Sequence, residues 1–87
     1  MFKNRNSDGK LNICGNKIAV LRKNLTPKVS QRKLADMLQL QGLDLDKNAI
    51  QKIESGNRFV TDIELKIIAK IFEVTSDYLL DESDTPK

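Results

Sequence analysis

The chain has 87 residues and a net charge of +3, with 31% charged and 5% aromatic residues. A chain of this length folds as one small domain with a modest core. Its single cysteine excludes an internal disulfide, and the lack of histidine removes the commonest general base and the commonest metal ligand. We therefore expect no enzyme activity, no metal site and no cofactor.

Positive charge gathers in one part of the sequence. Residues 1–60 hold 12 Lys/Arg and 5 Asp/Glu, a balance of +7, whereas residues 61–87 hold 3 and 7, a balance of −4. Such asymmetry is typical of a chain in which one part faces a polyanion, but chance clustering on a solvated surface explains it equally well. Charge alone leaves both interpretations open.

The sequence shows neither a signal peptide nor a membrane span. Residues 1–10 lack the apolar centre of a signal peptide, and no apolar run approaches membrane-spanning length. We expect a cytoplasmic protein with no membrane partner and no small-molecule ligand. Residues 1–10 and 82–87 are polar, are expected to be flexible tails, and flank one domain over residues 11–81.

The apolar periodicity of this domain predicts an all-α bundle of five helices and no strand. The first helix spans about Cys14 to Leu25, because Ile18, Leu21 and Leu25 repeat at helical spacing. Pro27 ends it, since proline disfavours helix in the residue before it and donates no backbone hydrogen bond.

The second helix begins after Ser30, a good N-cap, and is expected over residues 31–41. Its start is unusually basic. Arg32 and Lys33, with Lys28 just upstream, put positive charge where the helix dipole is already positive, which costs a few tenths of a kcal/mol. This cost calls for a functional explanation.

The stretch "LQLQGLDLD" alternates apolar and polar residues about Gly42, as a β-hairpin would. A lone two-stranded ribbon inside a helical bundle is marginal, so we interpret Gly42 as the left-handed end of the second helix and "LDL" as an extended connector. Leu43 and Leu45 are expected to fix this connector on the core, and Asp46 to cap the next helix.

The third helix is expected over about 47–55, with Gly56 as its stop and with Ile50 and Ile53 pointing inward. Its outward side is polar: Lys47, Asn48, Gln51, Lys52 and Ser55.

The fourth helix has the clearest start in the chain. Thr61 and Glu64 match a capping box, and apolar residues follow at helical spacing. A short fifth helix, "SDYLL", is capped by Thr75 or Ser76.

Four stretches, in order, carry a resemblance: "KIAVLRK", "SQRKLADML", "NAIQKIESGNR" and "TDIELKIIAKIFEVTSDYLL". Together they resemble the five-helix domain of the lambda repressor/Cro-like family, also called the XRE family, over roughly residues 14–81. The resemblance implies a helix-turn-helix and a sequence-specific transcriptional regulator of double-stranded DNA, of the repressor kind, in bacterial or phage cytoplasm. The same domain also occurs as an antitoxin or a protein-interaction adaptor, and the sequence leaves this alternative open.

The resemblance places the third helix in the major groove, where long polar side chains reach base edges. The implied base contacts are Lys47, Asn48, Gln51 and Lys52. The implied phosphate contacts lie at the start of the second helix and just after the third: Gln31, Arg32, Lys33, Lys28, Asn57 and Arg58. The alternative for the base-contact set is an ordinary solvated helix face.

Two charged residues gain a structural role from the same resemblance. Arg22 and Glu54 align with a pair that is common in the family, and we expect them to hold the third helix in place. Two independent surface charges are the alternative. Ala35 is expected where the second and third helices cross, because a large side chain there would push them apart.

One segment departs from the family. Ala35 and Ile50 are fifteen residues apart here, against about ten in the compact family form, which adds about one turn to the second helix and lengthens the connector. The longer turn therefore affects the pose of the third helix.

Two further interpretations concern the fifth helix and the reactive groups. Tyr78, Leu79 and Leu80 either form a homodimer contact, as the resemblance implies, or close the core of the monomer. Asp44 and Asp46 suit a connector and a helix cap better than a metal site. Cys14 has no histidine to activate it and lies on the core side of its helix.

Overall fold

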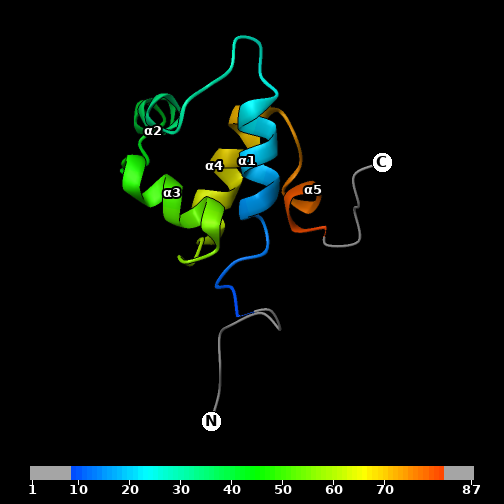
Figure 1. Cartoon of the computed structure of the whole chain (residues 1–87). Helices are drawn as coiled ribbons and strands as arrows, with labels where there is room; N and C mark the ends of the chain where they lie inside the picture. The colour runs from blue at the N-terminus through cyan, green and yellow to red at the C-terminus, as the bar shows by residue number, and fades with distance from the viewer. Residues whose placement is uncertain (1–8, 82–87) are drawn as a thin grey trace.

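A computed structural model of the chain describes residues 9–81, which form five helices and no strand (Figure 1). The helices are α1 (Gly15–Lys23), α2 (Gln31–Leu40), α3 (Lys47–Ser55), α4 (Asp62–Phe72) and α5 (Ser76–Leu80). The all-α bundle expected from the sequence is confirmed for these residues. The expected tails lie outside the described residues, apart from Gly9 and Lys10.

Side-chain caps start α2, α3, α4 and α5 where the sequence predicts. The Ser30 hydroxyl accepts from the Lys33 N–H at α2, and the Asp46 carboxylate accepts from the Ala49 N–H at α3. Thr61 forms a complete capping box at α4, and Thr75, not Ser76, caps α5. Each cap stabilises its helix by about 1 kcal/mol.

Left-handed residues end three of these helices. Gly42 follows α2 with φ +88°, Gly56 follows α3 with φ +82°, and Glu73 follows α4 with φ +58°. Beyond Gly42, the Leu43 N–H donates to the Leu38 carbonyl at 3.0 Å, which closes the helix in a Schellman motif. Glycine adopts this conformation without a steric cost, whereas glutamate does not.

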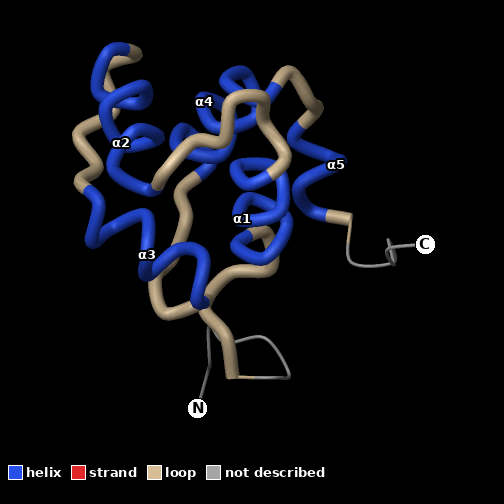
Figure 2. The backbone as a smooth tube through the Cα atoms, turned by 45° about the horizontal axis from the view of Figure 1, so that its top comes forward, coloured by secondary structure: helices blue, strands red, loops and turns tan. Residues whose placement is uncertain are grey.

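Every helix contributes to one apolar cluster. Figures 1 and 2 place α2 and α3 on one side of α1 and α4, and α5 on the other. Leu43 and Leu45 of the connector are buried to 9% and 4% exposure, as expected from the sequence. The largest fully buried side chains are Ile18, Leu34, Leu38, Ile50, Ile53, Ile68, Leu79 and Cys14.

The start of α1 lies directly against the end of α3. A Cβ added at Gly15 would collide with the carbonyl oxygen of Ile53, so only glycine fits there. The sequence predicts a close approach of helices at Ala35, which is 3% exposed. The tighter contact at Gly15 is not predicted by the sequence.

Among the described residues, no helix has both the length and the apolar character needed to cross a membrane.

Candidate nucleic-acid interface

The four residues expected to contact bases all lie exposed on α3. Lys47, Asn48, Gln51 and Lys52 occupy the face opposite the buried Ile50 and Ile53. None of their side chains is hydrogen-bonded or ion-paired to the described part of the chain. Their polar groups are therefore available to a partner.

The first turn of α2 and the residues just before it present a group of cations next to this face. Lys28, Arg32 and Lys33 are exposed, and no acidic residue lies in this turn to neutralise them. The N-terminal N–H groups of a helix add partial positive charge at the same place. This end of α2 is suited to an anionic partner.

A buried ion pair fixes α3 to the rest of the bundle. Arg22 Nε lies 2.7 Å from Glu54 Oε2, and the two side chains are only 11% and 8% exposed. A second guanidinium N–H donates to Glu54 Oε1 at 2.9 Å, and a third donates to the Val29 carbonyl at 3.0 Å. The expected structural pair is present, and the hydrogen bond to Glu54 raises the pKa of Arg22 above its ordinary value.

Gln31 joins this ion pair. Its amide Nε2 donates to Glu54 Oε1 at 2.9 Å, so its side chain is held at the junction of α2 and α3. An amide carries two N–H groups, which leaves one for another acceptor. The structure thus places Gln31, an expected phosphate contact, within the α2–α3 junction.

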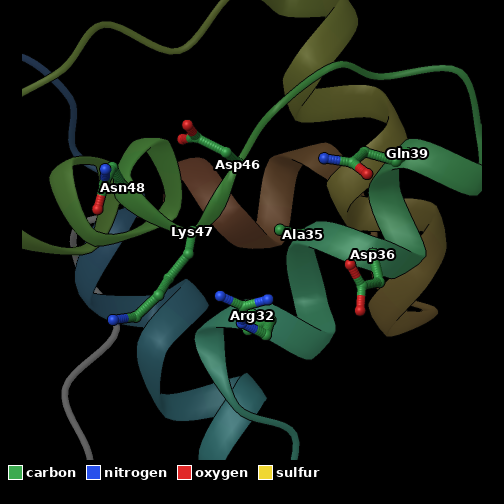
Figure 3. A pocket seen from close by; sticks show the side chains of 7 residues that line it. All are labelled: Arg32, Ala35, Asp36, Gln39, Asp46, Lys47 and Asn48. Atoms are coloured by element: carbon green, nitrogen blue, oxygen red, sulfur yellow. The ribbon is translucent and has the colours of Figure 1, made fainter.

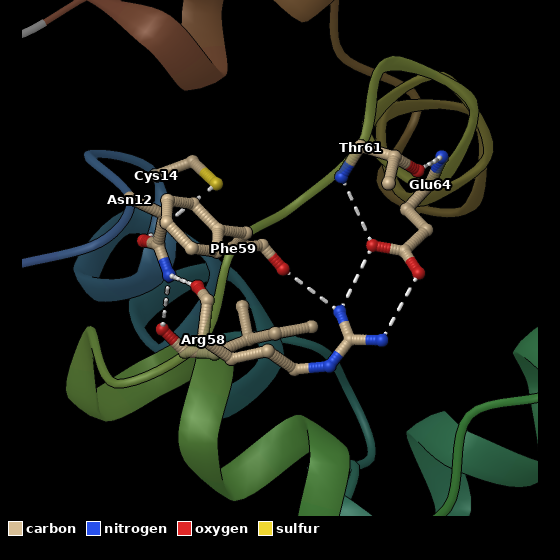
Figure 4. A network of polar contacts seen from close by, with 7 residues as sticks. Asn12, Cys14, Arg58, Phe59, Thr61 and Glu64 are labelled. Atoms are coloured by element: carbon tan, nitrogen blue, oxygen red, sulfur yellow. Dashed lines mark hydrogen bonds and ion pairs between the residues drawn. The ribbon is translucent and has the colours of Figure 1, made fainter. Parts of the chain in front are cut away.

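Arg58 is placed differently from the other expected phosphate contacts. Its guanidinium Nη1 donates to Glu64 Oε1 and to the Phe59 carbonyl, both at 2.9 Å, and Nη2 donates to Glu64 Oε2 at 3.2 Å (Figure 4). The side chain is 30% exposed. Its charge is therefore already paired, and the residue fixes the α3–α4 loop to α4.

Glu64 serves two structures at once. Its Oε1 accepts from the Thr61 N–H at 3.0 Å in the capping box while the carboxylate also binds Arg58. Burial raises the pKa of the Glu64 carboxyl, but the hydrogen bonds from Arg58 and Thr61 outweigh burial and leave the pKa below its ordinary value. The sequence predicts the capping box but not the pairing with Arg58.

Asn12 is an organising residue that sequence reasoning missed. Its Nδ2 donates to the carbonyls of Arg58 at 2.8 Å (Figure 4) and Ile53 at 3.1 Å. Its Oδ1 accepts from the Gly15 N–H at 2.8 Å. It therefore links the start of α1 to the end of α3. No local pattern marks such a residue, because the two carbonyls to which it donates lie more than 40 positions away.

The C-terminal end of α3 carries further contacts. Lys10 Nζ donates to the Ser55 carbonyl at 3.3 Å, and the Leu11 N–H donates to the Gly56 carbonyl at 2.8 Å. Asn57 is exposed, and its amide donates to the Ser55 hydroxyl at 3.1 Å. Lys10 belongs to the expected flexible tail, yet it lies against α3.

A hollow of about 520 Å³ opens between α2 and the start of α3 (Figure 3). It brings together three of the expected DNA contacts: Arg32 from α2, and Lys47 and Asn48 from α3. Its other lining residues are Ala35, Asp36, Gln39 and Asp46. Gln39 Nε2 donates to the Leu45 carbonyl at 3.0 Å and so ties the long connector to α2.

The residues of α5 differ in burial, which bears on whether this helix closes the core or forms a homodimer contact. Leu79 is 1% exposed and closes the core, whereas Tyr78 and Leu80 are 41% and 43% exposed. Lys17 Nζ lies 4.5 Å from the centre of the Tyr78 ring and donates to the carbonyls of Tyr78 and Asp81 at 2.8 Å. Lys17 thereby fastens the end of α5 to α1.

Cys14 is buried, as expected, and burial raises the pKa of its thiol. Within residues 9–81, no three Cys, Asp or Glu side chains gather in a way that would hold a metal ion. Comparison with known proteins found no match for this chain among family models, curated proteins or solved structures.

Proposed function

We propose that this protein is a sequence-specific transcriptional regulator, of the repressor kind, that inserts α3 into the major groove of double-stranded DNA. The proposal takes the chain as a member of the lambda repressor/Cro-like (XRE) family. The observation that carries it is the hollow between α2 and α3. There Arg32, from the basic start of α2, lies beside Lys47 and Asn48 at the exposed start of α3.

The residue types on α3 suit the chemistry of base edges. Lysine donates to O6 and N7 of guanine, and the amides of Asn48 and Gln51 both donate to and accept from adenine. Each good contact is worth about 1–3 kcal/mol of discrimination. The exposed polar face of α3 is thus chemically able to read sequence.

The cations near the start of α2 bind the phosphate backbone of the DNA. Lys28, Arg32 and Lys33 are exposed and have room to approach phosphates, while the N–H groups of the helix terminus bind phosphate directly. This role accounts for a helix start that is otherwise electrostatically unfavourable. Asn57 adds an exposed amide at the far end of α3.

A homodimer completes the proposal. Regulators of this kind bind two half-sites about 34–36 Å apart with one recognition helix each. Tyr78 and Leu80 offer exposed apolar surface on α5, on the side of the bundle away from α2 and α3 (Figure 1). Sedimentation that shows only monomer on a selected DNA site would contradict this part.

The test is selection of bound sites from a pool of random duplex DNA, followed by titration of the selected site against salt. We expect one enriched motif, and an affinity that falls steeply with salt because each neutralised phosphate releases counterions. Lys33→Ala should weaken binding to all sequences alike and flatten the salt slope, whereas Asn48→Ala should relax the preference at one motif position. A pool without enrichment would overturn the proposal and favour the antitoxin or adaptor alternative.

A further inference from the structure

We infer that Asp36 is a specificity-determining residue of this interface, which penalises DNA in general and favours sites that present a cytosine amino group to the hollow. The inference rests on the proposed function. It starts from a feature that DNA binding alone does not explain: a carboxylate in the midst of the expected contacts.

Asp36 lines the hollow from α2, one helical turn after Arg32 (Figure 3). It is exposed, and no described residue forms an ion pair or hydrogen bond with its side chain. Asp46, the other carboxylate of the hollow, has a structural task, because its Oδ1 caps α3 through the Ala49 N–H at 2.8 Å. Asp36 is thus the carboxylate of this hollow without such a task.

An unpaired carboxylate at a surface that meets DNA is unfavourable for every sequence. Phosphates within a Debye length, about 8 Å at physiological ionic strength, repel it with little screening. Asp36 lines the same hollow as Arg32, an expected phosphate contact, so docking of Arg32 on a phosphate carries the carboxylate toward the DNA backbone. The residue therefore lowers affinity for DNA irrespective of sequence.

This loss of affinity is offset where the DNA offers a hydrogen-bond donor to the Asp36 carboxylate. In the major groove, the N4 amino group of cytosine is the base donor that aspartate accepts. The hollow leaves space for such a contact, either direct or through a water that bridges the two groups. Asp36 thus lowers the affinity for non-specific DNA but not the affinity for sites with a suitably placed cytosine. It therefore raises the ratio of specific to non-specific affinity.

The experiment compares Asp36→Ala with Asp44→Ala. Both variants remove one negative charge, and Asp44 is an exposed residue of the connector after α2 that does not line the hollow. Affinities are measured by fluorescence anisotropy for the selected site and for a scrambled duplex, at three salt concentrations. Random-site selection is repeated with each variant, and circular dichroism confirms that both are folded.

We expect Asp36→Ala to bind the scrambled duplex more tightly than Asp44→Ala does, and to lower the ratio of selected to scrambled affinity about ten-fold. Its selected motif should lose a cytosine preference at one position in each half-site. Equal ratios for the two variants with an unchanged motif would overturn the inference while leaving the proposed function intact. Failure of the unmodified protein to bind any duplex would instead overturn the proposed function.

Discussion

The two ends of α3 differ in how their polar groups are used. At the C-terminal end, Glu54 pairs with Arg22, and the Ile53 carbonyl accepts from Asn12. At the N-terminal end, the exposed side chains of Lys47 and Asn48 form no hydrogen bond or ion pair with the described chain. We call these the anchored end and the presented end.

Within the nine residues of α3, the anchored end contributes to stability, and the presented end is left for recognition of a partner. An anchored end fixes the position of the helix, so its free side chains keep a defined geometry without contacts of their own. Contacts with bases require placement to within about 0.5 Å, which loose support does not provide. Substitutions at the anchored end should therefore change folding, and substitutions at the presented end should change binding alone.

The largest expected effect is at the buried ion pair. Arg22→Met removes the partner of Glu54 and leaves its carboxylate 8% exposed with only the Gln31 amide as a donor. The loss in free energy of unfolding should be about 3–5 kcal/mol, measured by urea denaturation. The double variant Arg22→Met/Glu54→Leu should recover much of this loss, because it buries no unpaired charge. A double variant no more stable than Arg22→Met would contradict this account.

The next largest loss in free energy of unfolding is expected for Gly15→Ala. The new Cβ would collide with the Ile53 carbonyl, and the backbones of α1 and α3 must then move apart. We expect a loss of about 2–3 kcal/mol in urea denaturation. Gly42→Ala is the matched control, since its φ of +88° is strained for alanine but the added Cβ meets no atom within 4 Å. The free energy of unfolding of Gly42→Ala should fall by only about 1 kcal/mol. Equal losses for the two variants would argue against the close approach of α1 and α3 at Gly15.

Local sequence signals account well for the helix ends. Ser30, Asp46 and Thr61 were identified as caps because capping depends on residues within one turn, which a sequence displays directly. Gly42 and Gly56 were likewise identified as helix ends. The same local logic explains why the alternation around Gly42 resolves into a helix end and a connector.

Contacts between distant residues were not accessible in this way. Asn12, Gly15 and the pairing of Arg58 with Glu64 depend on how α1, α3 and α4 cross, and no periodicity encodes that geometry. Arg22 and Glu54 were identified through the family resemblance, not through their spacing. The hollow is likewise formed by residues of two helices, α2 and α3, together with Asp46 just before α3.

The Arg58–Glu64 pair should make stability depend on pH. The folded-state pKa of Glu64 is lowered from its ordinary value of 4.5, so the pair contributes fully above that pH and its contribution is lost as the pH falls through the lowered pKa. The free energy of unfolding of Glu64→Gln should therefore be about 1 kcal/mol lower than that of the unmodified protein at pH 7. In acid the two free energies of unfolding should converge. Arg58→Met should show the same convergence. The check is the urea midpoint from pH 7 down to pH 2, and a constant gap over that range would contradict the assignment.

The smallest effect on folding is expected at the presented end, where the comparison is sharpest. Asn48→Ala and Gln51→Ala remove exposed amides that bond to no described residue, so each should change the free energy of unfolding by less than about 0.5 kcal/mol. Ser55→Ala is the control on the same helix at the anchored end, where the hydroxyl donates to the Lys52 carbonyl at 3.1 Å. If Asn48→Ala instead destabilised the fold as much as changes near Glu54, the polar face of α3 would be part of the structure and not a surface kept for a partner.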